Sequence, residues 1–319
     1  LGDVYKRQTL TQQINTRSEF DRHRGGERAA LKLDLYTTQL NVHADRHFRH
    51  LRLEYGMMAE RQQNFFDGRY FIPNYLRYQL GLVGVSTVHY GESLFELGLR
   101  LDQMKNTTFR YVNDQLTEEQ FAFGGWSASV GMQHPFSEGL NLHLGVSRKF
   151  RAPEINELFS AGLHHGAAAL EFGDLELKEE IAYTFNAALR FTGSKWSWNI
   201  EPFVHYFDGF INLEPTNETQ LSIRGAFPVF RYLQSTVLYS GVDAGLRFAA
   251  NDHWQFGSQL NLVYAMNTET MNFVYGVPAP RCQLNVKHLF DPSSFLANSY
   301  ALVRANYVFE HKWAELEQD

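Results

Sequence analysis

Two adjacent histidines, His164 and His165, are the side chains of this sequence best suited to hold a metal. They stand between Gly162 and Gly166, in a stretch without strand-like alternation. Neutral imidazole is a good ligand for haem iron, zinc and copper, and a histidine in an exposed loop is free to coordinate. The pattern predicts a ligand-binding and metal-binding site at His164 and His165. A polar surface turn without a ligand accounts for the same residues.

Other reactive groups are more scattered. His43, His47 and His50 recur around an aspartate, which fits a second extracellular metal patch or a solvated loop without a ligand. Ser160 near His164 is the only nucleophile and base that can be paired, and no Gly-Xaa-Ser-Xaa-Gly elbow accompanies it. We therefore predict no catalytic residue.

The histidine stretch lies between two segments in which apolar and polar residues alternate. In residues 140–147 every even position is apolar and every odd position is polar or glycine, and residues 95–102, 184–191 and 242–248 behave similarly. A period of two is typical of β-strands whose two faces meet different surroundings. We assign Arg100, Arg148, Arg190 and Arg247 to the polar face, where acidic neighbours would pair with them.

Strand length and aromatic placement favour a membrane barrel over a soluble sandwich, which would alternate as well. Several runs hold about ten residues, and an outer-membrane strand needs ~9–11. Trp196, Trp198, Tyr300 and Tyr307 stand near strand ends, where the aromatic side chains of such barrels meet the membrane surface. The predicted fold class is all-β, an antiparallel transmembrane β-barrel.

Composition agrees with a barrel and excludes other classes. The 319 residues contain no apolar run of the ~18 residues that a membrane-spanning helix needs. A formal charge of -6 and the absence of a basic block exclude nucleic acid as a partner. A single cysteine, Cys282, excludes an internal disulfide framework and a cysteine-rich metal site.

Further strands follow from the same alternation. Turn signals such as Asn113-Asp114 and Gly139 separate them. Short joints at residues 192–195 and 250–253 contrast with the long segment 151–179, and barrels of this kind have short turns on one rim and long loops on the other. The predicted strands lie at residues 30–45, 50–63, 75–89, 93–108, 123–133, 181–191, 195–210, 232–249, 254–268, 281–289 and 300–310.

The long segment begins with a proline and a helical pattern. Pro153 removes a ladder donor and restricts the residue before it, so it marks where the strand leaves the sheet. Glu154 and Glu157 then follow at helical spacing with Ile155 and Leu158. We predict a short helix across the mouth of the barrel.

Two sequence boxes enclose the histidines and resemble those of TonB-dependent outer-membrane receptors. That family has a Phe-Arg-Ala-Pro box, an Asn-Glu-Leu-Phe sequence, a His-containing loop and a Gly-Asn-Pro-Xaa-Leu-Xaa-Xaa-Glu box. The last box departs from the family pattern, because Asp174 and Leu175 stand where Asn-Pro is usual. The first two sequences are intact, and we assign them a structural role: Phe150, Arg151, Ala152, Pro153, Asn156, Glu157, Leu158 and Phe159.

The resemblance implies a barrel of about 22 strands with a plugged lumen, of which this chain holds a part. It implies an active importer of a scarce metal complex in the outer membrane of a Gram-negative bacterium, driven by the TonB complex through a plug domain. Iron-siderophore, haem, zinc and cobalamin all stay open as the substrate. Haem receptors of the family carry an axial histidine, and zinc receptors a Gly-Xaa-His pattern, where His164 and His165 stand here.

No bond chemistry and no intrinsic cofactor are expected of such a receptor, because the metal complex is its substrate. Membrane lipid is the other expected partner. Two alternatives share the alternation: a passive outer-membrane porin, and a barrel enzyme such as a phospholipase or a protease.

The ends of the sequence differ from the rest. Residues 1–8 lack alternation and resemble a translated sequencing adapter, a non-native scar that leaves residues 9–319 as a partial receptor barrel domain. A plug domain, a TonB box and a signal peptide have no counterpart, and residues 313–319 form a polar tail instead of a terminal aromatic strand. We therefore expect a fragment of a longer receptor.

Overall fold

Most of the chain forms one β-sheet in the computed structural model, which describes residues 4–20, 29–164, 166–222, 225–291 and 298–310. The main path of the sheet runs β1-β2-β3-β4-β5-β6-β7-β10-β11-β12-β13-β14-β15, and each pair on it is antiparallel. The strands are β1 Val4–Glu19, β2 Leu31–His47, β3 Leu51–Gly68, β4 Asn74–Tyr90, β5 Ser93–Val112, β6 Gln115–Ser137, β7 Leu140–Arg151, β8 Ala161–His164, β9 Ala169–Phe172, β10 Glu180–Thr192, β11 Trp196–Ser222, β12 Gly225–Ala249, β13 Trp254–Asn267, β14 Arg281–Leu289 and β15 Tyr300–Val308.

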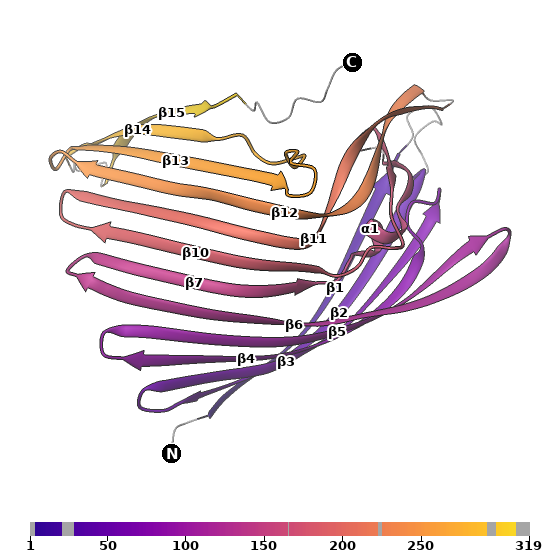
Figure 1. Cartoon of the computed structure of the whole chain (residues 1–319), viewed down its shortest axis with the longest axis horizontal. Coiled ribbons are helices and arrows are strands. Elements are labelled where there is room, and N and C mark those ends of the chain that lie inside the picture. The colour runs from indigo at the N-terminus through magenta and orange to yellow at the C-terminus, as the bar shows by residue number, and fades with distance from the viewer. Residues whose placement is uncertain (1–3, 21–28, 165, 223–224, 292–297, 311–319) are drawn as a thin grey trace.

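The sheet curves into an open wall (Figure 1). Hairpin follows hairpin along the chain, and within the described residues β1 and β15 are edge strands that do not pair with each other. The single helix of the described part, α1 (Ile155–Phe159), lies within the curve of the wall. The predicted partial antiparallel barrel is confirmed.

The two rims of the wall differ. We call the edge with residues 48–50, 91–92, 138–139, 193–195 and 250–253 the turn rim, because these joints are short. We call the edge with residues 69–73, 113–114, 152–179 and 268–280 the loop rim. Asn113 and Asp114 both have positive φ, 51° and 62°, as a two-residue hairpin of type I′ requires. The predicted contrast between short turns and a long segment is confirmed.

The outer face carries an apolar band. Leu97, Leu99 and Leu101 alternate along β5 with 50% to 56% of their surface exposed. Val130 on β6 and Val146 on β7 pair directly and are exposed to a similar degree. Large apolar side chains left open on several neighbouring strands form the surface that meets lipid.

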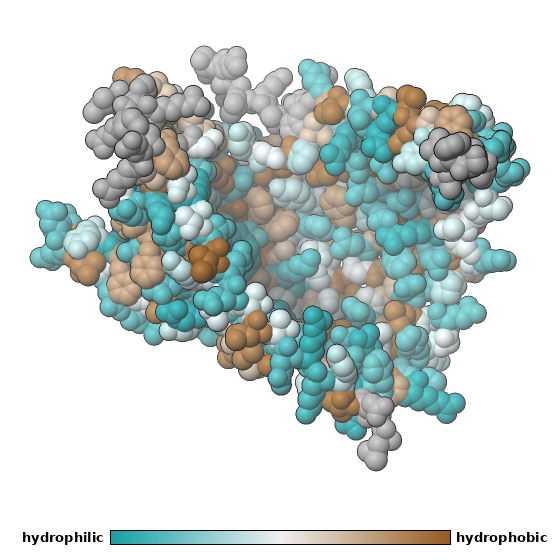
Figure 2. Space-filling model, turned by 180° about the vertical axis from the view of Figure 1, so that it is seen from behind, coloured by the Kyte–Doolittle hydropathy of each residue, from teal (hydrophilic) through white to brown (hydrophobic). Residues whose placement is uncertain are grey.

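The inner face is more polar. Figure 2 shows the molecule hollowed, with hydrophilic side chains prevailing around the hollow. In the described part of the chain, no helix is long and apolar enough to cross a bilayer.

Aromatic rings gather near the turn rim. The ring of Trp196 stacks on Phe248 with centroids 4.2 Å apart, and Phe191 stacks on Trp198 at 5.9 Å. Tyr300 begins β15 at the same rim and is 57% exposed. The Trp and Tyr rings suit the boundary between lipid and water, because each has an apolar body and a polar N–H or O–H group.

The predicted strands are all present, but several of their ends on the loop rim extend further than expected. β11, for example, continues to Ser222 instead of residue 210, and β6 begins at Gln115 instead of residue 123. Strand β1 was not predicted, and it includes residues 4–8, which pair with residues 42–46 of β2. The origin of residues 1–8 as a sequencing scar stays a prediction.

Candidate functional site

The long segment between β7 and β10, residues 152–179, folds back inside the curve of the wall, and we call it the inserted segment (Figure 1). It starts where β7 ends at Arg151, and Pro153 is among the fully buried side chains that follow. Glu154 has extended backbone angles and precedes α1, and its N–H donates to Glu157 Oε2 at 2.8 Å. A carboxylate in the first turn that accepts from the N–H of the N-cap residue stabilises the start of a helix. The predicted short helix is confirmed.

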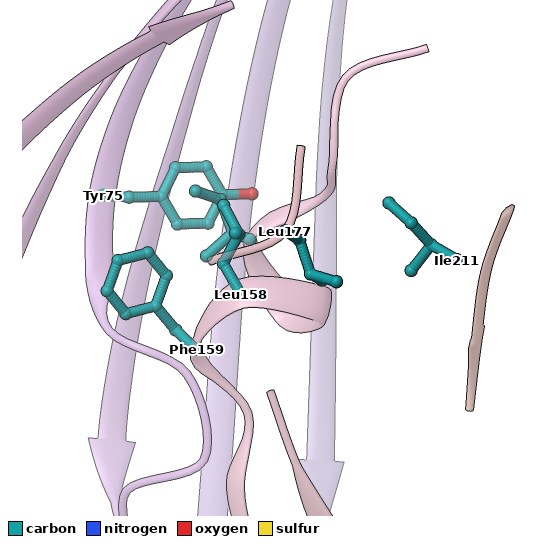
Figure 3. Close-up of a cluster of buried hydrophobic side chains, with 6 residues drawn as sticks. Tyr75, Leu158, Phe159, Leu177 and Ile211 are labelled. Atoms are coloured by element: carbon teal, nitrogen blue, oxygen red, sulfur yellow. The ribbon is translucent and has the colours of Figure 1, made fainter. Parts of the chain in front are cut away.

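An apolar cluster attaches α1 to the wall (Figure 3). Ile155, Leu158 and Phe159 on the helix keep 2% to 6% of their surface exposed. Tyr75 of β4 and Ile211 of β11 are buried against them, although these strands lie far apart along the sheet. Side chains from distant strands therefore meet on the helix. The complete buried cluster is Tyr75, Ile155, Leu158, Phe159, Leu177 and Ile211.

Arg151 holds two carboxylates at the end of β7. Its Nη1 lies 2.8 Å from Glu157 Oε2, and its Nη2 lies 3.0 Å from Glu180 Oε2. The N–H of Ile211 also donates to Glu180 Oε2 at 3.0 Å. Both carboxylate side chains are only 13% and 11% exposed, so each depends on these donors. The arginine thereby joins β7, α1, β10 and β11.

A second arginine attaches the helix start to β4. Arg77 is 4% exposed, and its Nη1 lies 2.8 Å from Glu154 Oε2. Its Nε donates to Asn106 Oδ1 at 2.9 Å. On the opposite side, Asn156 Nδ2 donates to the Tyr232 hydroxyl of β12 at 3.0 Å. The inserted segment is bonded to both arms of the curved wall.

The second box packs against the C-terminal end of α1. Gly173 N donates to Ser160 O at 2.7 Å, and Asp174 N donates to Glu157 O at 2.9 Å. A Cβ on Gly173 would lie 2.5 Å from the backbone carbon of Leu158, so only glycine fits there. Asp174 Oδ1 then accepts from Glu176 N at 2.9 Å and closes the following turn.

Strands β8 and β9 form a small hairpin that spans the interior near the loop rim. β9 pairs in parallel with residues 229–231 of β12. At the other side Ala161 N donates to Phe71 O at 3.0 Å, and Arg69 Nη2 donates to Leu163 O at 3.1 Å. Tyr70 lies in the same 69–73 loop, and burial raises the pKa of its hydroxyl above the usual range.

His164 ends β8, and both of its ring nitrogens are occupied. Nδ1 lies 2.5 Å from Glu171 Oε1 on β9, and Nε2 contacts the guanidinium of Arg17 on β1. Arg17 also pairs with Glu19 at 2.5 Å. The histidine side chain is 25% exposed and its ring centroid lies 5.6 Å from that of Phe71. Its partners Arg17 and Glu171 were not singled out from the sequence.

The remaining candidates lie apart from this cluster. His165 falls outside the described residues. His43 and His47 belong to strand β2, and His50 lies in the joint of residues 48–50, so a loop over all three histidines is wrong. The second metal patch stays a prediction. Among the described residues no group of three or more His, Cys, Asp or Glu side chains is placed to hold a metal ion.

The Ser160 and His164 pair does not form. Ser160 is 3% exposed, and its Oγ has no hydrogen-bond partner in the part of the chain that the structure describes. His164 is bonded to Glu171 and Arg17 instead. A buried hydroxyl without a base is not an activated nucleophile.

Comparison with known proteins decides the family. The family model described as "TonB dependent receptor-like, beta-barrel" matches residues 2–312. The chain belongs to the TonB-dependent receptor β-barrel family. This family resides in the outer membrane of Gram-negative bacteria, and its members are transporters and receptors.

Solved structures of TonB-dependent receptors share the fold. The copper transporter OprC superposes with a TM-score of 0.69 at 16% identity, over 89% of this chain and 46% of that one. An FrpB iron transporter from Neisseria meningitidis (F5-1 variant) gives 0.67 at 12% identity, over 96% and 48%. The Serratia marcescens hemophore receptor HasR, a double mutant solved with its hemophore HasA and heme, gives 0.57 at 15%, over 90% and 56%. The chain spans about half the length of these receptors.

Proposed function

We propose that the protein imports a metal complex across the outer membrane with energy supplied by the TonB complex through a plug domain. The main support for this proposal is the position of the inserted segment inside the wall. Its helix and hairpin are bonded to β1, β4, β11 and β12 and occupy the inside of the wall near the loop rim. A segment held across the interior suits a gated importer better than an open pore.

The proposed substrate class is taken from the names of the similar solved structures. The matched structures include a copper transporter, an iron transporter and a hemophore receptor with heme. These names mention copper, iron and heme, so a metal or a metal complex is the substrate class to test. Iron-siderophore, haem and zinc are the members of that class that the family resemblance implies. The metal complex is cargo and not a resident cofactor.

His164 and His165 are our proposed ligand contacts. Glu171 accepts at His164 Nδ1, which keeps the proton on that nitrogen and leaves the lone pair of Nε2 for another partner. Metal-binding histidines commonly donate their second ring nitrogen to a carboxylate in this way. Arg17 contacts Nε2 in the structure, so it must move aside before His164 can coordinate haem iron or zinc.

Haemin titration tests the site. The full-length protein is expected to show a Soret shift with haemin that disappears in a His164→Ala, His165→Ala double variant. Arg17→Gln removes the competing cation and should bind haemin more tightly than the wild type. An unchanged shift in the double variant would remove these histidines from the site, although haemin would still bind. No shift in the wild type would exclude haem, and the import proposal would then rest on another metal complex.

Cellular uptake tests the import itself. Uptake of the metal complex by cells that express the full-length protein should stop when TonB is deleted. A rate that is the same with and without TonB would favour the passive porin. Hydrolysis of a lipid or peptide that is lost in Ser160→Ala would favour the barrel enzyme.

A further inference from the structure

Two shallow grooves cross the outer face of the wall beside the apolar band. The first has a volume of about 450 Å³ and is lined by Trp126, Val130, Val146, Arg148, Tyr183 and Tyr206. The second has about 410 Å³ and is lined by Leu40, Ala59, Arg61, Tyr78, Leu80 and Lys105. Each groove has an apolar floor, and at least one cation and one tyrosine lie at its end toward the loop rim.

Arg148 belongs to the outer face, which corrects its assignment to the polar side. It pairs with Ala128 of β6 and Tyr183 of β10 and alternates in phase with Val146. Its guanidinium lies over the Trp126 ring, with Cζ 3.9 Å from the centroid, and it also donates to the Trp126 carbonyl. A cation held against an aromatic face keeps its charge available for an external anion.

Arg61 and Lys105 flank Tyr78 in the second groove. The register places Arg61 opposite Tyr78, and Tyr78 opposite Lys105. Both cations are exposed, and Arg61 Nη2 donates to the neutral side chain of Gln63 at 2.8 Å. Glu60 alternates to the inner face, where it accepts from Gln39 at 3.4 Å.

The three cations have no anionic partner among the residues that the structure describes. Neither Arg61, Lys105 nor Arg148 forms an ion pair within residues 4–20, 29–164, 166–222, 225–291 and 298–310. They border the apolar band on the side of the loop rim, and long loops of outer-membrane barrels face the outside of the cell. Cationic side chains at such a boundary extend to the head groups of the adjoining leaflet.

We propose that the two grooves bind acyl chains of outer-leaflet lipids whose phosphate head groups contact Arg148 in one groove, and Arg61 with Lys105 in the other. The apolar floor of each groove contacts the acyl chain, and the cation at the end of the groove binds the phosphate. Guanidinium matches the geometry of phosphate through paired N–H donors. The inference depends on the fold and its orientation, and it is independent of which substrate is imported.

Lipid titration of the full-length protein tests the proposal. The protein is delipidated in a neutral maltoside detergent and titrated with bis-phosphorylated lipid A, while native mass spectrometry counts bound lipid. Affinity for lipid A should fall about fivefold for each cation removed, as expected for Lys or Arg beside anionic lipid. The variants are Arg148→Gln and the double change Arg61→Gln, Lys105→Gln.

Lys149→Gln is the matched control, because Lys149 is the exposed neighbour of Arg148 on the other face of β7. It should bind lipid A like the wild type, and circular dichroism should show the same strand content for all variants. Diacylglycerol, which has acyl chains but no phosphate, should bind the wild type and the variants alike. Equal lipid A affinity in all proteins, an equal loss in Lys149→Gln, or displacement of lipid A by inorganic phosphate would overturn the proposal. The last result would indicate a free-phosphate site.

Discussion

The inner and outer faces of the same wall hold their cations differently. Five arginines of the inner face each form an ion pair with a carboxylate at 2.6 to 2.9 Å: Arg77, Arg100, Arg110, Arg151 and Arg190. Three cations of the outer face, Arg61, Lys105 and Arg148, have no ion pair in the described ranges. Arg61 donates to Gln63, Arg148 lies over the Trp126 ring, and Lys105 is the register partner of Tyr78. Arginine occurs in both groups, so the surroundings of the side chain and not its type decide whether it forms an ion pair.

Burial explains the difference. Carboxylates that face the inserted segment are largely removed from water, and an ionised group there needs a partner inside the protein. On the outer face the apolar band meets lipid, and anionic head groups lie within reach of a long side chain at its boundary. The arginine that pairs with the buried carboxylates beside the inserted segment, Arg151, therefore contributes to stability, whereas the outer-face cations are available to bind.

Arg151→Ala should have the largest effect. The change leaves Glu157 and Glu180 charged and nearly buried without their cation, which destabilises the folded state by about 3–5 kcal/mol. Unfolding by guanidinium chloride of the full-length protein in detergent micelles measures this free energy. Arg148→Ala is the outer-face control and should cost about 1 kcal/mol or less, the worth of its contact with Trp126.

A triple variant tests whether the two buried carboxylates cause the loss of stability. Arg151→Ala combined with Glu157→Gln and Glu180→Gln removes the buried charges together with the cation, so part of the lost stability should return. The comparison between the faces fails if Arg151→Ala and Arg148→Ala unfold at the same denaturant concentration.

Val130→Arg should have the next largest effect. Val130 is 54% exposed in the middle of the apolar band, and an arginine there faces lipid at a cost of about 2–4 kcal/mol. Ser129→Arg places the same side chain on the inner face of β6, where the hollow admits water. Measured in the same way, Ser129→Arg should stay close to the wild type. Equal losses for the two variants would contradict the assignment of the faces.

The strands were predictable where their two faces differ in polarity. In the apolar band Leu97, Leu99 and Leu101 alternate with polar or glycine residues, and this part of β5 was found. Beyond the apolar band both faces of a strand meet water or the inserted segment. Apolar and polar residues therefore no longer alternate there. Residues 117–120 of β6, for example, are all polar, so no alternation marks this part of the strand. β1 was missed for the same reason.

The site was only partly predictable. The start of the inserted segment and its helix follow from local signals, because Pro153 and the spacing of Glu154 and Glu157 act within a few residues. The partner of His164 on β1 is Arg17, which is 147 residues away in the sequence. No local pattern encodes such a contact, since the curvature of the sheet and the hairpin of β8 and β9 create it.

Arg190→Gln should have the smallest effect. Its ion pair with Glu201 at 2.9 Å lies on the inner face, but the arginine side chain is 50% exposed and the carboxylate 32%. Water and salt screen such a pair, so its loss should cost about 0–1 kcal/mol and less at high ionic strength. Guanidinium itself adds salt, so urea unfolding at low and at high sodium chloride is the suitable measurement. A loss as large as that of Arg151→Ala would mean that an inner-face position alone, and not burial by the inserted segment, makes these ion pairs important for stability.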